Sequence, residues 1–177
     1  MTGLLDLGPR ICIIGPSGSG KSTLADAIGS HLDLSVVHLD RYRYFPGTQW
    51  QLRPDAEFEL LHARAVDEER WVMDGNYSVL LPGRLARATG LVLLDVSTAR
   101  TIARYVRRTL HRGVRLGGLD VRERLSWRFV GYNLRNGGPN RRRRRRFFEE
   151  AALPKVLLVG PREVRAFVRD EGLRIRR

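Results

Sequence analysis

Cysteine, lysine and long apolar runs are scarce in this chain of 177 residues. Its one cysteine, Cys12, cannot form a disulfide within the chain, and this favours the reducing cytoplasm. No apolar stretch approaches the roughly 18 residues that a membrane-spanning helix needs, and residues 1–10 show no basic-then-apolar signal pattern. The composition therefore predicts a cytoplasmic protein that does not cross a membrane.

Basic residues are abundant, but almost all of them are arginine. The formal net charge is +13, and of the 32 basic residues only Lys21 and Lys155 are lysine. A positive charge favours anionic partners, and a guanidinium can bind a phosphate through two hydrogen bonds where an ammonium cannot. A GC-rich genome would produce the same bias, so the arginine content alone does not identify a partner.

The segment 15–22 carries the strongest functional signal. It matches the complete G-x-x-x-x-G-K-[ST] pattern of a nucleotide-binding P-loop, or Walker A motif. Its residues are Gly15, Pro16, Ser17, Gly18, Ser19, Gly20, Lys21 and Ser22. The glycines let backbone N–H groups turn around a polyphosphate, Lys21 places a charge at the β and γ oxygens, and the Ser22 hydroxyl can ligate Mg²⁺. A nucleotide with Mg²⁺ is therefore the predicted ligand, and the adjoining Thr23 is included in its binding segment. The choice of ATP as that nucleotide comes from a missing motif and a resemblance, both given below.

Apolar runs alternate with helical patterns along the chain. Strands are predicted near 10–14, 35–39, 71–74, 91–95 and 155–159. Helices are predicted near 21–32, 55–69, 98–112, 120–135, 141–152 and 161–171. This order predicts one α/β domain over 1–177, with a parallel sheet between two layers of helices. Ligands of such sheets bind beyond the carboxyl ends of the strands, where the sequence places Gly15, Asp40, Asp74 and Asp95.

An arginine-rich lid is predicted in the second half of the chain. Arg104 and Arg108 lie on one side of the helix 98–112, where they would repel each other unless an anion such as phosphate lay between them. Glycine-rich breaks at 113–119 and 137–139 flank the next helix. The segment of about 113–140 is therefore predicted to move as a hinged lid over the nucleotide.

Two other segments each allow two interpretations. The six arginines of 141–146 are either a nucleic-acid-binding patch or a solvated helix face from which one or two side chains reach the nucleotide. The second interpretation is preferred, because six adjacent helical residues point in all directions rather than along one groove. The aromatic and basic residues of 41–54 form either a pocket for a second substrate or an irregular loop fixed to the core.

Missing motifs narrow the chemistry of the predicted P-loop. The chain lacks the N-K-x-D motif that recognises guanine, and neither Asp74 nor Asp95 is followed by the Glu that activates water in many ATPases. Transfer of the γ-phosphoryl group to an acceptor is favoured over hydrolysis, because transfer needs mainly positioning and charge compensation.

A wider set of elements carries a family resemblance. It comprises the P-loop, His38-Leu39-Asp40, Pro46-Gly47, the run from Trp71 to Tyr77, and Leu93-Leu94-Asp95. Over about residues 10–168 the chain resembles the adenylate-kinase-related P-loop proteins of the DNA topology modulation family. Its Asp-Gly-Asn-Tyr run at 74–77 is similar to the D-G-F-P-R element of nucleoside monophosphate kinases, where the Asp helps to hold Mg²⁺ through water.

The resemblance implies a strand order and several residue roles. The expected order is 2-3-1-4-5, with Arg104 and Arg108 as lid arginines. Adenine is expected beside the loop Gly160-Pro161-Arg162. The arginine that grips the acceptor phosphate in D-G-F-P-R has no equivalent in the 74–77 run, and Arg84 and Arg87 are the candidates to replace it.

Three carboxylates have expected roles in catalysis. Asp74 and Asp95 are the two candidates for the metal-side group, the carboxylate that helps to bind Mg²⁺ next to Ser22. Asp74 is preferred because it carries the family resemblance. Asp40 faces the acceptor, where it would take the proton of a hydroxyl; an acceptor phosphate would need no base.

The sequence as a whole predicts an ATP-binding, nucleotide-kinase-like phosphotransferase. Its expected catalytic residues are Lys21, Asp74, Arg104, Arg108 and Asp40. The acceptor is an unidentified small molecule. A nucleic-acid-binding, ATP-dependent regulator and a non-catalytic nucleotide binder remain as alternatives.

Overall fold

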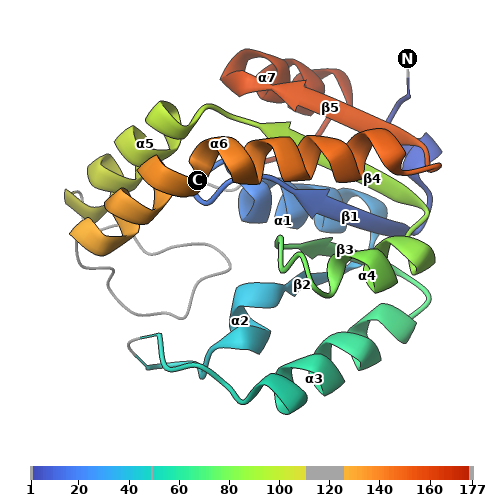
Figure 1. The fold of residues 1–177 in the computed structure, drawn as a ribbon. Coiled ribbons are helices and arrows are strands. Elements are labelled where there is room, and N and C mark those ends of the chain that lie inside the picture. The colour runs from blue at the N-terminus through green and yellow to red at the C-terminus, as the bar shows by residue number, and fades with distance from the viewer. Residues whose placement is uncertain (1, 49, 111–125, 176–177) are drawn as a thin grey trace.

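A parallel five-stranded sheet forms the centre of the computed structural model, which describes residues 2–48, 50–110 and 126–175 (Figure 1). The strand order is β2-β3-β1-β4-β5, which confirms the predicted α/β architecture and the expected 2-3-1-4-5 order. The strands are β1 (Arg10–Ile14), β2 (Ser35–His38), β3 (Trp71–Asp74), β4 (Gly90–Asp95) and β5 (Lys155–Val159). Every strand was predicted to within one residue at each end.

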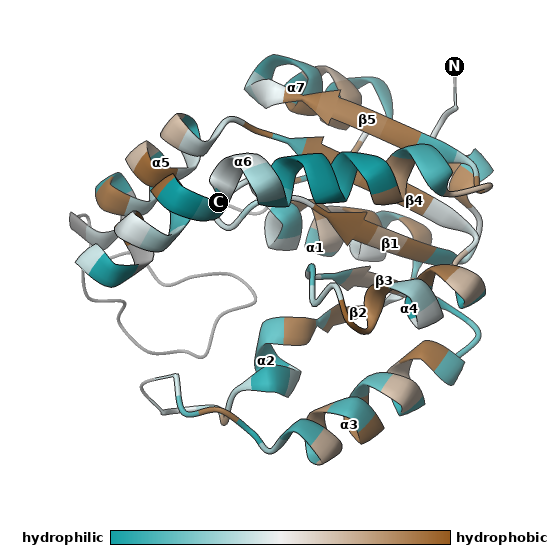
Figure 2. Ribbon diagram, in the orientation of Figure 1, coloured by the Kyte–Doolittle hydropathy of each residue, from teal (hydrophilic) through white to brown (hydrophobic). Residues whose placement is uncertain are grey.

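Helices cover both faces of the sheet because the central strands are apolar on both sides. Ile11 and Ile13 face one core, which they share with α1 (Lys21–Leu32) and α7 (Gly160–Asp170). Cys12 and Ile14 face the other core, under α3 (Asp55–Asp67), α4 (Leu81–Arg87) and the end of α6 (Trp127–Glu150). Figure 2 shows β1, β4 and β5 as hydrophobic and the middle of α6 as hydrophilic. No helix in the described part of the chain is both long and apolar enough to cross a membrane.

Three short elements were not predicted. They are a 3-10 turn (Leu5–Leu7), the helix α2 (Leu39–Arg43) and α4. Helices of one or two turns leave too few residues for a periodic apolar pattern to be visible. The start of the 41–54 segment is therefore helical, and Asp40 lies in the first turn of α2 rather than at the end of β2.

The predicted break at 137–139 is wrong, because α6 continues through it with Pro139 inside the helix. A Cβ atom on Gly137 would lie 2.3 Å from Oγ1 of Thr98, at the start of α5 (Thr98–Leu110). The glycine thus permits close packing of α5 and α6. This packing offsets the stability that α6 loses because Pro139 cannot donate a backbone hydrogen bond. Of the predicted 113–140 lid, residues 113–125 lie outside the described residues and the remainder belongs mainly to α6.

A candidate phosphotransfer site at the P-loop

The backbone of the P-loop depends on glycine at three positions. Gly18 and Gly20 have φ values of +73° and +102°, which residues with a Cβ atom rarely adopt. A Cβ atom on Gly15 would lie 2.7 Å from the carbonyl oxygen of Leu94. The loop leads directly into the N-terminus of α1, where unpaired backbone N–H groups favour an anion. This geometry agrees with the predicted phosphate cradle.

The two functional side chains of the P-loop are held by defined partners. The Lys21 side chain is buried, and its Nζ donates a hydrogen bond to the carbonyl oxygen of Pro16 at 3.0 Å. The Ser22 hydroxyl donates to Oδ2 of Asp74 at 2.7 Å. Asp74 reaches the P-loop because β3 pairs with β1, with Asp74 opposite Ile13. The predicted pair of Ser22 and Asp74 is therefore assembled, and Thr23 lies beside it in the first turn of α1.

Asp74 also contacts a histidine that was quoted only as part of the family resemblance. His38, at the end of β2, lies between two carboxylates: its Nδ1 is 2.7 Å from Oδ1 of Asp74 and its Nε2 is 3.0 Å from Oδ1 of Asp26. Burial lowers the pKa of His38, but the hydrogen bond and charge of Asp74, followed by those of Asp26, outweigh burial and raise it. Since carboxylates only accept hydrogen bonds, both bonds form when His38 is an imidazolium.

The loop after β3 fixes the start of the P-loop through Asn76. The amide Oδ1 of Asn76 accepts a hydrogen bond from Gly15 N at 3.1 Å, and its Nδ2 donates to Gly15 O at 2.9 Å. This pair joins the Asp-Gly-Asn-Tyr run to the nucleotide loop. Sequence reasoning treated Asn76 only as a departure from D-G-F-P-R and missed this role.

Arg84 holds the same loop through hydrogen bonds to its backbone. Its side chain is fully buried, and Nη2 donates to the carbonyl oxygens of Gly75 at 2.7 Å and Asn76 at 3.1 Å. Its Nε lies 3.3 Å from Sγ of Cys12. Arg87 instead donates to the carbonyl of Asp67, at the end of α3. Neither arginine occupies the place of the missing acceptor arginine.

Asp40 is held near the site by Tyr77. The Tyr77 hydroxyl donates to Oδ1 of Asp40 at 2.7 Å, and its ring packs edge-on against Phe58 at 4.9 Å between centroids. Tyr77 has a positive φ of 32°, an uncommon value for a residue with a bulky side chain. The strained backbone places this ring between α2 and α3, so Asp40 has a fixed orientation.

The aromatic and basic residues of the 41–54 segment contact one another. Tyr44 and Trp50 pack edge to face at 5.1 Å, and the guanidinium of Arg53 lies 4.4 Å from the Phe45 ring centroid. Arg43 pairs with Asp55 at 2.6 Å. Together with the packing of Tyr42 against the core, these contacts agree with the interpretation of a loop fixed to the core.

Asp95, the second candidate for the metal side, is bound by arginines of α6. Its Oδ1 accepts a hydrogen bond from Arg141 Nε at 2.6 Å, and its Oδ2 accepts from Arg141 and from both Nε and Nη2 of Arg145. Burial raises the pKa of Asp95, but the hydrogen bonds and charges of the two arginines lower it overall. Both carboxylate oxygens are thus occupied by cations.

The side chains of the six arginines of 141–146 point in three different directions from α6. Arg141 and Arg145, four residues apart, face Asp95. Arg143 and Arg144 line a cavity beside the P-loop. Arg142 is exposed, and Arg146 pairs with Glu150 at 2.8 Å on the surface. The run therefore does not present one continuous basic face.

The predicted lid and adenine residues meet on the other side of the P-loop. Arg104 Nη1 donates to the carbonyl of Ser19 at 3.3 Å. Arg104 and Pro161 line a cavity of about 520 Å³ together with Arg100, Arg107 and Arg165. Gly160 begins α7 with a φ of +75°, whereas Arg162 is exposed. Arg108 lies in α5, but its side chain lies outside the described part of the chain.

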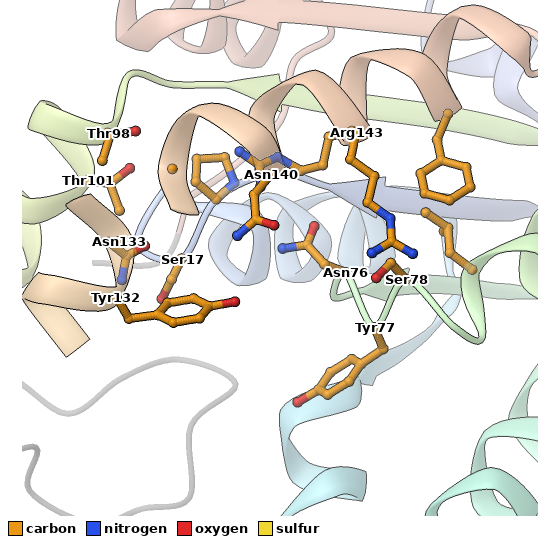
Figure 3. A pocket seen from close by; sticks show the side chains of 15 residues that line it. Ser17, Asn76, Tyr77, Ser78, Thr98, Thr101, Tyr132, Asn133, Asn140 and Arg143 are labelled. Carbon is orange, nitrogen blue, oxygen red and sulfur yellow. The ribbon is translucent and has the colours of Figure 1, made fainter. Parts of the chain in front are cut away.

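A smaller cavity of about 290 Å³ lies between the P-loop and α6 (Figure 3). The P-loop contributes Pro16 and Ser17, and the loop after β3 contributes residues 76–78. Thr98 and Thr101 of α5 close one end, and polar side chains of α6 form the roof. Sequence reasoning did not predict this cavity, because α6 was expected to break at the point where it passes over the P-loop.

The chain is similar to a known protein in structure but not in sequence. No protein-family model matches the chain, and no characterised protein matches it in sequence. Among solved structures, a deoxyadenosine kinase from M. mycoides, with dCMP and a flexible dCDP bound, is 15% identical with a TM-score of 0.44. The alignment covers 90% of this chain and 94% of that one. The strand order and the P-loop of this chain define its fold.

Proposed function

We propose that this protein is an ATP-dependent phosphotransferase that moves the γ-phosphoryl group of ATP to a small-molecule acceptor. The hydrogen bond between Ser22 and Asp74 is the observation that carries the proposal. It places a hydroxyl and a carboxylate, the oxygen donors that Mg²⁺ prefers, next to a loop whose backbone suits a phosphate. Asp74 is preferred over Asp95 as the metal-side group, because both oxygens of Asp95 accept hydrogen bonds from arginines.

The residues around the P-loop fit a nucleotide with Mg²⁺. The backbone of Gly15 to Thr23 would bind the phosphates, with Lys21 and Arg104 offsetting their charge and Ser22 and Asp74 holding the metal ion. When bound, Mg²⁺ supplies charge neutralisation at the phosphate oxygens. We assign the nucleoside end to the cavity of about 520 Å³ beside Pro161, in keeping with the expected adenine loop.

The acceptor side is assigned to the carboxyl ends of β2 and β3. Asp40 is the group that would take the proton of an acceptor hydroxyl, with Tyr77 holding its other oxygen in a fixed direction. His38 orients Asp74 through its hydrogen bond and is a positioning residue in this scheme. Arg84 and Asn76 keep the loop after β3 fixed relative to the P-loop.

A nucleic-acid-binding regulator is less well supported. Binding to a phosphate backbone needs several cations along one groove, whereas Arg141 and Arg145 are committed to Asp95 and Arg146 pairs with Glu150. No observation on the described residues favours a surface for duplex DNA.

The chain's two lysines offer a matched test of the proposal. Lys21→Ala should lower ATP-dependent phosphoryl transfer by about 10²–10³-fold, because it removes the charge at the transferred group. Lys155→Ala is the control, since Nζ of Lys155 donates to carbonyls at the end of α6 and lies outside the proposed site. Transfer from γ-labelled ATP to a panel of nucleotides and hydroxylated metabolites measures activity, and thermal melting checks the fold.

If the panel does not contain the acceptor, calorimetric measurement of ATP binding still tests the proposal. The wild-type protein and Lys155→Ala should bind ATP more tightly with Mg²⁺ than without it, and Lys21→Ala should lose most of this affinity. A wild-type protein without any Mg²⁺-dependent affinity for a nucleoside triphosphate would contradict the proposal.

A further inference from the structure

The cavity between the P-loop and α6 is positively charged. None of the described residues that line it is Asp or Glu, whereas Arg143 and Arg144 both reach its wall. Figure 3 shows Arg143 extending from α6 toward the loop that carries Asn76 and Ser78. The cavity therefore contains two cationic side chains and no carboxylate to neutralise them.

The nearest carboxylate does not satisfy Arg144. Both oxygens of Asp95 accept hydrogen bonds from Arg141 and Arg145, and Arg144 forms no hydrogen bond or ion pair with any residue that the structure describes. Burial lowers the pKa of Arg144, although the charge of Asp95 acts in the opposite direction. A partly buried guanidinium without a bonded anion is costly unless a ligand supplies one.

The uncharged part of the wall is suited to a small polar molecule. Asn76 and Asn140 point toward each other from opposite sides, and Ser17 and Tyr132 lie beside them (Figure 3). Thr101 also lines the cavity, and its buried Oγ1 has no hydrogen-bond partner among the described residues. Phe147 adds an apolar surface. A volume of about 290 Å³ is at the small end for ligand sites and suits one small molecule.

We propose that this cavity binds the acceptor and that the acceptor is a small anion whose phosphate or carboxylate group is held by Arg143 and Arg144. The inference rests on the proposed phosphotransferase function. Ser17 belongs both to the cavity wall and to the P-loop, so a molecule anchored at α6 has its other end at the phosphate cradle. Tyr77 also lines the cavity, and its hydroxyl donates to Asp40, which lies outside the cavity wall.

The proposed phosphoryl transfer needs no reactant other than ATP and the acceptor. An acceptor oxygen forms a bond to the γ phosphorus, and the bond from that phosphorus to the β–γ bridging oxygen breaks, with ADP leaving with the electron pair. An ionised acceptor oxygen, such as that of a phosphate or carboxylate, has no proton to lose, so this transfer needs no base.

Paired ligands test the charge of the acceptor. The probes are ribose and ribose 5-phosphate, cytidine and CMP, and glycerol and glycerate, titrated by calorimetry into protein saturated with Mg²⁺ and β,γ-imido-ATP. At least one anionic member should bind about tenfold or more tightly than its neutral partner. Equal binding within every pair, or no binding by any anionic member, overturns the proposal.

Three arginines of one run provide the variants and their control. Arg144→Gln and Arg143→Gln should each remove most of the preference for the anion, whereas Arg142→Gln, which does not line the cavity, should change it by less than twofold. Retention of the full preference in both Arg144→Gln and Arg143→Gln overturns the proposal. Either variant alone is sufficient if the other fails to fold.

The same titrations in Lys21→Ala, without the ATP analogue, separate this inference from the proposed function. Anion binding that persists there and still depends on Arg144 supports the cavity, even if the wild-type protein transfers no phosphoryl group. Anion binding that disappears with Lys21 shows that the probes had occupied the P-loop and overturns the inference.

Discussion

Asp74 and Asp95 look alike in the sequence but occupy opposite electrostatic environments in the structure. Each ends an apolar strand, each strand pairs with β1, and the two residues are 5% and 3% exposed. Asp74 lies next to one imidazole and one hydroxyl, whereas Asp95 is held by two guanidinium groups. The two carboxylates face opposite sides of the sheet, Asp74 toward α1 and Asp95 toward α6, and the segments that pack over them make the difference.

The partners of each carboxylate explain what it can do. Burial raises the pKa of Asp74, but the hydrogen bond and charge of His38 and the contributions of Lys21 and Ser22 lower it overall, so Asp74 is ionised beside the P-loop. A hydroxyl can rotate to share a metal ion with the carboxylate. The two arginines of Asp95 instead leave no oxygen available and attach α6 to the sheet. The proposed metal-side role therefore fits Asp74, whereas the contacts of Asp95 join α6 to the sheet.

Exchanging each carboxylate for its amide should separate the two sites most strongly. Asp74→Asn should lower Mg²⁺-dependent ATP affinity and transfer by about 10–100-fold or more, because a neutral amide is a weaker partner for a metal ion. Asp95→Asn should change nucleotide affinity by less than about threefold but lower the free energy of unfolding by about 1–3 kcal/mol. Calorimetry and urea unfolding measure the two effects.

The reverse result would invalidate this contrast. If Asp95→Asn abolished the Mg²⁺ dependence while Asp74→Asn only lowered stability, Asp95 would be the metal-side group. The exposure of Arg141 and Arg145, 44% and 39% of their side chains, places the stability loss at the lower end of the stated range, since water can solvate the freed guanidinium groups.

Two adjacent glycines test whether the Asp95 site depends on the close packing of α6. Gly137→Ala should destabilise the protein by about 1–3 kcal/mol, because its Cβ would lie 2.3 Å from Thr98 Oγ1. Gly138→Ala should be neutral or stabilise by up to about 1 kcal/mol, since no atom lies within 4 Å of the added Cβ and alanine favours helix. Urea unfolding of both variants measures the difference, and equal effects would contradict the packing argument.

The smallest expected effect is a difference in pH dependence between the two sites. The pKa of His38 is raised above 6.5, so its bonds to Asp74 and Asp26 contribute stability fully below pH 6.5 and lose it as the pH rises through the folded-state pKa. The pKa of Asp95 is lowered, so its contribution is present above its ordinary value near 4 and is lost only as the pH falls.

Unfolding between pH 6 and pH 9 without divalent cations checks this difference. The difference in the free energy of unfolding between wild type and His38→Gln should shrink as the pH rises. The corresponding difference for Asp95→Asn should stay constant. His62 does not interfere in this window: burial and then the charge of Arg84 lower its pKa to about 4, so its effect appears only below pH 6.5. A difference for His38→Gln that does not change with pH would contradict an imidazolium that donates to both Asp74 and Asp26.

The parts that could be predicted were those with local or repeating signals. The P-loop is a contiguous motif, and the five strands are apolar runs between polar segments, so both followed from the sequence. Asp74 was preferred over Asp95 only through a family resemblance, because the local pattern of the two is the same. The short helices α2 and α4 and the unbroken α6 were missed, since their stability comes from packing rather than from periodicity or propensity.

The supporting residues of the site could not be predicted for a different reason. Asn76 and His38 act through partners 61 and 36 residues distant in sequence, namely Gly15 and Asp74. Arg84 acts on nearby Gly75 and Asn76, but its burial brings it against Cys12, 72 residues away. Nothing in the neighbouring residues marks a side chain for such a contact. The cavity under α6 likewise exists only because residues 16–17, 76–78 and 132–147 are brought together.

The sequence by itself determined the phosphate loop, the parallel sheet and the order in which strands and helices follow one another, because each depends on residues that are close along the chain. The tertiary structure decided which buried carboxylate is available to a ligand, which arginines are committed to Asp95 and which face the cavity. Those choices depend on distances between segments far apart in sequence, and electrostatic energies change steeply with such distances.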